Sequence, residues 1–72
     1  MFSIALRHDE HTRKYRVAAS QQFGWDLTLT EDFTPTRQVH FEDWHRVERA
    51  LHSLQLEVLE LTANGWKVEN AA

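Results

Sequence analysis

Hydrophobic and polar residues alternate along the first half of the chain. The alternating segments are residues 2–7, 14–19 and 23–30. Such period-two patterning is typical of strands that bury one face. The polar segments 8–12 and 31–35 predict turns, and a shorter fourth strand is predicted from Thr36 to Phe41. The first half therefore predicts an antiparallel meander of three or four strands.

From Glu42 onward, the spacing of apolar residues changes to alternating steps of three and four. This spacing is typical of the apolar stripe of an amphipathic helix. The stripe consists of Trp44, Val47, Leu51, Leu54, Val58 and Leu61. We predict a helix from about Glu42 to Ala63, ended by Asn64 and Gly65.

An alternative interpretation of the C-terminal segment treats it as β structure. Residues 54–58 also alternate, and Asn64-Gly65 is a favoured hairpin turn that would lead into a strand at residues 66–68. The helix is favoured because Val58-Leu59 breaks the alternation, whereas the helical spacing continues to Leu61. The predicted fold is thus one small α+β domain, residues 1–72, with the meander packed on one long C-terminal helix. The predicted core positions are Ile4, Leu6, Tyr15, Val17, Trp25, Leu27, Leu29, Val39, Trp44, Val47, Leu51, Leu54 and Val58.

Two leucines lie off the helical stripe. Leu56 and Leu59 fall on the side of the predicted helix away from the sheet, with Trp66 within reach of them. Single surface leucines are ordinary, but two on one turn predict a contact patch. A helix of about 22 residues is ~33 Å long, whereas strands of six to eight residues span roughly 20–27 Å. This end of the helix should therefore overhang the sheet, and we expect a second copy or another protein to cover it.

Composition supports association. The chain has 72 residues and no cysteine, so disulfides cannot supplement its small core. A core of this size rarely supplies more than about 3–5 kcal/mol, and a homodimer is the expected supplement. The N-terminus lacks the features of a secretory signal, and no run approaches the ~18 apolar residues of a membrane span. We therefore expect a cytoplasmic protein with no membrane partner.

The charge distribution leaves nucleic acid as an alternative partner. A formal charge of −3 argues against binding through bulk positive charge. Alternation nevertheless places Arg7, Lys14 and Arg16 on the strand face opposite the predicted core, with Arg13 nearby. A solvated strand face needs charges in any case, and the aromatic residues at 23 and 25 follow the buried pattern, so they are not available for base stacking. Binding of single-stranded or structured nucleic acid by these four basic residues is the alternative hypothesis.

Catalytic and metal-binding patterns are weak. His8 and His11 flank two acidic residues, but two histidines in a turn need a third ligand to hold a metal firmly, and the sequence leaves this undecided. The chain has no cysteine nucleophile, no serine in a glycine-flanked turn and no glycine-rich phosphate loop. We therefore expect a non-catalytic protein-interaction module without metal or cofactor, acting as a homodimer through Leu56, Leu59 and Trp66.

Overall fold

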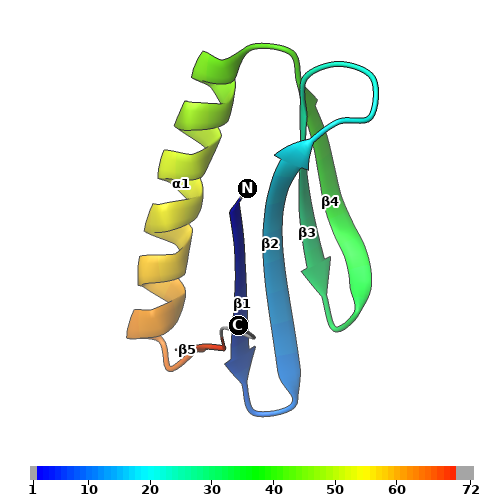
Figure 1. Cartoon of the computed structure of the whole chain (residues 1–72). Coiled ribbons are helices and arrows are strands. Elements are labelled where there is room, and N and C mark those ends of the chain that lie inside the picture. The colour runs from blue at the N-terminus through cyan, green and yellow to red at the C-terminus, as the bar shows by residue number, and fades with distance from the viewer. Residues whose placement is uncertain (1, 70–72) are drawn as a thin grey trace.

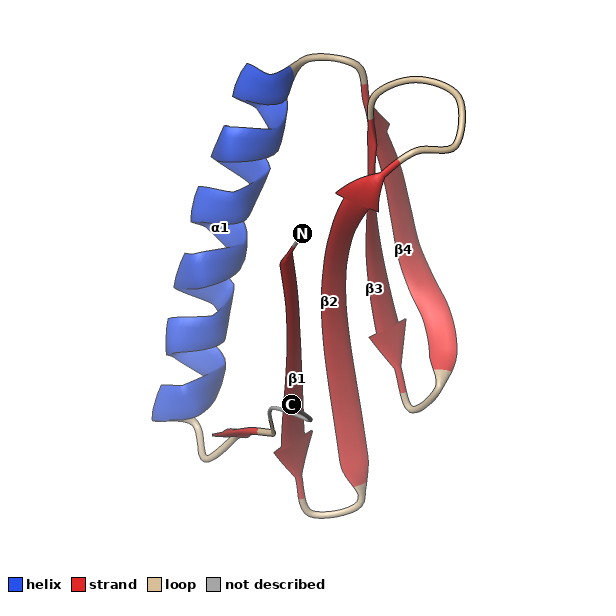
Figure 2. Ribbon diagram, viewed as in Figure 1, coloured by secondary structure: helices blue, strands red, loops and turns tan. Residues whose placement is uncertain are grey.

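The computed structural model describes residues 2–69 and shows one helix packed on one face of an antiparallel sheet (Figure 1). The elements are β1 (Phe2–His8), β2 (His11–Ala19), β3 (Trp25–Glu31), β4 (Thr34–Phe41), α1 (Trp44–Ala63) and β5 (Lys67–Val68). The strand order is β4-β3-β2-β1-β5, because the chain returns after the helix to add β5 beside β1. The predicted α+β meander is confirmed, with five strands rather than three or four. Figure 2 shows the helix and the strands as two separate layers.

The strand register gathers apolar side chains on the face of the sheet that α1 covers, which we call the inner face. Tyr15 of β2 lies opposite Ile4 of β1 and Leu29 of β3. Because side chains alternate between faces, the apolar positions of neighbouring strands meet on the same side. The buried core consists of Leu6, Tyr15, Val17, Leu27, Leu29, Val47 and Leu54. Burial of such side chains contributes about 1.5–3 kcal/mol each and holds α1 to the sheet.

The turns of the β1–β2 and β3–β4 hairpins are shorter than the predicted polar segments. Asp32 and Phe33 have φ angles of 50° and 69°, the left-handed values that a two-residue hairpin turn requires. β4 therefore begins at Thr34 and not at Thr36. Pro35 lies at a register shift between β3 and β4, where its missing N–H is tolerated.

Both ends of α1 are capped. The N-cap residue Asp43 accepts a hydrogen bond from the N–H of His45 at 3.0 Å, so the helix starts slightly later than predicted. At the other end Gly65 has a φ of 99°, and the N–H of Trp66 donates to the carbonyl of Leu61 at 3.0 Å, as in a Schellman motif. Within residues 2–69, no helix combines the length and apolarity needed to span a membrane.

The segment that allowed two interpretations is helical. Residues 54–58 lie in α1, so the hairpin alternative is wrong for them. The chain does form a strand immediately after Trp66, but this strand is β5 and its partner is β1, with Val68 opposite Leu6. The cap at the end of α1 turns the chain back toward the sheet. A strand of two residues is too short for alternation to predict it.

Two predicted core residues lie at the rim. Val39 is 37% exposed and Trp44 is 42% exposed, although the Trp44 ring contacts Trp25 with centroids 5.1 Å apart. Strands lie about 4.8 Å apart and a helix is about 10–12 Å wide, so α1 cannot fully cover β4. The predicted core extended over more of the sheet than a single helix can cover.

Gly24 provides a test of the loop between β2 and β3. Its φ is 80°, and a methyl group there would run into the carbonyl oxygen of Phe41. We expect Gly24→Ala to lower the free energy of unfolding by more than about 1 kcal/mol, measured by urea denaturation. Gly65→Ala is the matched control, because φ is again positive but the methyl would meet only the movable ring of His8, at 3.3 Å. Equal losses in the two variants would contradict a backbone clash specific to Gly24.

Candidate functional site

An open apolar groove, which we call the β1 groove, runs between α1 and the edge of β1. It is lined by Phe2, Ile4, Gln55, Val58 and Leu59. Its volume is about 360 Å³. Within residues 2–69, β5 pairs with this edge only at Leu6 and Arg7, and the N–H of Glu69 donates to the carbonyl of Ala5 at 2.7 Å. The backbone edge at residues 2–4 therefore lies beside the groove, where another strand can add.

The three residues of the predicted contact patch have different surroundings in the structure. Leu59 is 64% exposed and lines the β1 groove. Leu56 is 55% exposed, and helical spacing places it further round α1, away from the sheet. Trp66 instead packs within its own chain, with its ring stacked on His8 at 5.5 Å between centroids. Leu59 is thus the member of the patch that belongs to a groove.

Arg13 lies on the inner face, where its side chain contacts other residues of the fold. Its guanidinium is 5.7 Å from the ring centroid of Trp66 and forms an ion pair with Glu31 at 2.7 Å. It also donates a hydrogen bond to the hydroxyl of Tyr15 at 3.1 Å. Because residues 13 and 15 share a strand face, Arg13 does not join the three outer basic residues with which it was grouped.

Polar contacts join α1 to the β4 side of the sheet. The hydroxyl of Tyr15 donates to Oε1 of Glu57 at 3.3 Å, and Arg37 of β4 lies 3.6 Å from the same oxygen. Burial, followed by the negative charge of Glu57, raises the pKa of Tyr15 above its ordinary value of 10.0 and keeps the hydroxyl protonated. This flank of the helix is therefore occupied by polar groups, whereas the flank beside β1 is apolar.

The opposite side of the sheet, which we call the outer face, carries basic residues. Arg7, Lys14 and Arg16 are exposed there, as alternation predicts. Lys67 of β5 lies opposite Arg7 and adds a fourth basic residue. The favoured sequence prediction missed Lys67 because it placed no strand after the helix. Arg7 is partly neutralised by an ion pair with Glu69 at 3.0 Å.

Phe33 is a second residue of the outer face that the sequence prediction missed. It occupies the β3–β4 turn, is 85% exposed, and lines a depression together with Ala5, Arg7, Lys14 and Thr30 among others. The signal in the sequence is a large aromatic residue inside a polar turn segment. That segment predicted a turn but not the face of the sheet over which the ring would lie.

His8 and His11 lie opposite each other across the β1–β2 hairpin but have different partners. The ring of His8 stacks on Trp66, whereas Nδ1 of His11 lies 3.1 Å from the carboxylate of Asp32. Within residues 2–69, no three histidine or acidic side chains gather closely enough to hold a metal ion. The described residues therefore give no support to metal binding by His8 and His11.

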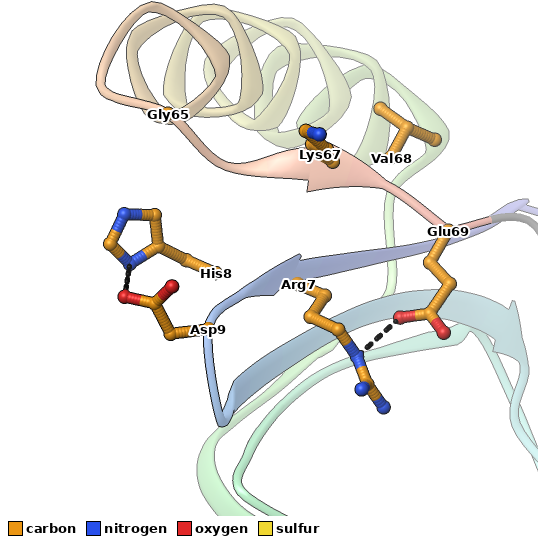
Figure 3. A pocket seen from close by; sticks show the side chains of 7 residues that line it. All are labelled: Arg7, His8, Asp9, Gly65, Lys67, Val68 and Glu69. Carbon is orange, nitrogen blue, oxygen red and sulfur yellow. Dashed lines mark hydrogen bonds and ion pairs between the residues drawn. The ribbon is translucent and has the colours of Figure 1, made fainter.

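A pocket of about 470 Å³ lies between the end of β1 and β5 (Figure 3). Arg7 extends toward Glu69, and His8 lies beside Asp9, with Nδ1 of His8 3.7 Å from the carboxylate (Figure 3). Because these charged groups pair with one another inside the pocket, they are poorly placed to recognise a charged ligand. This pocket is therefore a poorer binding site than the β1 groove.

No protein-family model matches the chain, and neither a curated protein nor a solved structure matches it. Function is therefore inferred from the two surfaces that stay uncovered by the described residues. These are the β1 groove and the outer face of the sheet.

Arg13 and Lys14 are neighbours on opposite faces of β2, and replacing each by Gln tests their placement. We expect Arg13→Gln to lower the free energy of unfolding by about 1–2 kcal/mol, because it removes an ion pair, a hydrogen bond and a cation–π contact. Lys14→Gln should change it by less than about 0.5 kcal/mol. Urea denaturation measures both variants. A larger effect at Lys14 than at Arg13 would contradict the assignment of faces.

Asp32 links the two hairpin turns and predicts a pH dependence. Its carboxylate accepts from the N–H of Thr12 at 2.9 Å and pairs with His11, and these contacts lower the pKa of Asp32 below 3.8. A lowered pKa stabilises the fold above pH 3.8, and this contribution disappears as the pH falls through the folded-state pKa. Asp32→Asn, which imitates the protonated carboxyl, should be less stable than the parent at neutral pH. The difference in urea midpoint should shrink well below pH 3.8; a constant difference would contradict the assignment.

Proposed function

We propose that the chain is a non-catalytic protein-interaction module that forms a homodimer through the β1 groove. The observation that carries the proposal is the juxtaposition of an apolar groove with the strand edge at residues 2–4. Apolar side chains supply hydrophobic binding energy, and the strand edge supplies directed hydrogen bonds. Together they favour a partner that presents both a strand and apolar side chains.

A second copy of the chain meets both requirements. An antiparallel pair of identical strands is self-complementary about a two-fold axis, because each copy offers the surface that it receives. With the axis near Ser3, Phe2 of one copy lies opposite Ile4 of the other. The two copies of α1 then lie side by side on the same face of a continuous sheet, with Leu59 between them and Leu56 at the rim.

The edge at β4 is less suited to pairing. Pro35 in β4 offers no N–H, and the register shift beside it disturbs the strand. Proline and β-bulges are devices that protect strand edges from association. Arg37 on this strand is also engaged with Glu57 of α1. Of the two sides of the sheet, the one that carries the β1 groove is the better interface.

The small core gives a thermodynamic reason for dimerisation. Among residues 2–69 of the single chain, seven apolar side chains are buried, whereas Phe2, Ile4 and Val58 are only partly buried. Each apolar side chain that becomes fully buried contributes up to about 1.5–3 kcal/mol. Association through the groove therefore adds burial to a domain whose own core is limited by its size.

Leu59→Glu tests the interface, with Leu56→Glu as its matched control. Both leucines are more than half exposed in the single chain, so both variants should keep the helix content of the parent. Leu59→Glu should shift the chain to the monomer, because a carboxylate would be buried against the partner. Leu56→Glu should weaken association much less.

Light scattering coupled to size exclusion measures the mass across a wide range of concentration. The parent chain should have the mass of two copies at micromolar concentration. A parent chain that is monomeric throughout, or equal weakening by the two variants, would contradict a dimer through the β1 groove.

A further inference from the structure

The outer face of the sheet carries no second layer among residues 2–69, and α1 lies on the other side (Figure 2). Small side chains flank the long basic ones along its cross-strand rows. Ala5 lies opposite Lys14, which in turn lies opposite Thr30. This part of the face is therefore flat, with long basic side chains rising from it.

The outer face is positively charged in a molecule whose net charge is −3. Its basic residues are Arg7, Lys14, Arg16 and Lys67. Two described carboxylates on the same side are Asp26, which pairs with His40 at 2.7 Å, and Glu69, which pairs with Arg7. Lys14 and Arg16 remain exposed two positions apart on β2. A negatively charged, extended ligand is complementary to this distribution.

Phe33 supplies an aromatic surface beside these charges. It has a φ of 69°, an unusual value for a bulky residue, and the residue is 85% exposed. The ring lines a depression of about 230 Å³ with Ala5, Thr30 and Lys14 among others. An exposed aromatic ring beside basic side chains is the combination that proteins use to stack an unpaired base and hold its phosphates.

We propose that the outer face binds single-stranded nucleic acid, with a base stacked on Phe33 and phosphates contacting Lys14, Arg16 and the neighbouring basic residues. An unpaired strand is favoured over a duplex because stacking requires a base whose face is accessible. Among residues 2–69, no helix lies on this face to enter a duplex groove. The proposal does not depend on the homodimer, which uses the edge of β1 and the flank of α1.

Fluorescence anisotropy with labelled single-stranded DNA and RNA of about 12 nucleotides tests the proposal, using the full chain at low and physiological salt. We expect saturable binding that Phe33→Ala weakens by about 5- to 150-fold, the effect of losing one stacked base. Phe23→Ala is the matched control, because Phe23 is also exposed, at 63%, but lies in the loop between β2 and β3. It should leave the affinity unchanged.

Charge variants provide an independent measurement. Lys14→Gln should reduce the slope of log affinity against log salt by about 0.7, the value for one phosphate contact on a single strand. Arg49→Gln, at an exposed position of α1, removes the same charge away from the outer face and should leave the slope unchanged. Circular dichroism and thermal unfolding show whether each variant is folded.

Three results would overturn the proposal. The first is an absence of saturable binding to either oligonucleotide at low salt. The second is equal weakening by Phe33→Ala and Phe23→Ala, which would make the aromatic effect non-specific. The third is tighter binding to a duplex or to heparin than to the single strands, with no dependence on Phe33, which would reduce the surface to a general anion-binding face.

Discussion

A single α-helix covers a sheet that is wider than itself, and the other features of the molecule depend on this mismatch. Five strands about 4.8 Å apart span ~19 Å, whereas a helix with its side chains is about 10–12 Å wide. Val47 and Leu54 anchor α1 over the buried residues of β1, β2 and β3. The two flanks of the helix and the outer face of the sheet are left for other contacts.

These three surfaces carry different kinds of side chain. On the β4 flank, Glu57 joins Tyr15 and Arg37 in a polar contact between helix and sheet. On the β1 flank, the described residues leave apolar side chains and a strand edge uncovered, which is the basis for the proposed homodimer. The outer face carries Lys14, Arg16 and an exposed aromatic ring. Because the dimer would join two sheets edge to edge, it would also place two outer faces side by side and lengthen the surface available to a nucleic acid strand.

The sequence predicted the helix and the four long strands well because each apolar pattern continues regularly over many residues. Alternation placed Arg7, Lys14 and Arg16 on one face, and the helical stripe separated Leu56 and Leu59 from the core. Features that depend on packing between distant segments could not be predicted in this way. β5 forms because the helix cap directs the chain to β1, and Trp66 packs on His8 and Arg13 once that has happened. The exposure of Val39 likewise depends on the width of the sheet. The position of Phe33 depends on the geometry of a two-residue turn.

Disulfide trapping at Ser3 tests the proposed interface most directly, because the chain has no cysteine of its own. Ser3 is exposed at the centre of the β1 edge that residues 2–69 leave unpaired. Residues opposite each other in an antiparallel pair have Cα atoms about 4.5–5.5 Å apart, within the range of about 4.4–6.8 Å that a disulfide spans. Mild oxidation of the Ser3→Cys variant should give a covalent dimer, whereas Gln38→Cys on the β4 edge should stay a single chain. Cross-linking no more efficient at Ser3 than at Gln38 would contradict a dimer through β1.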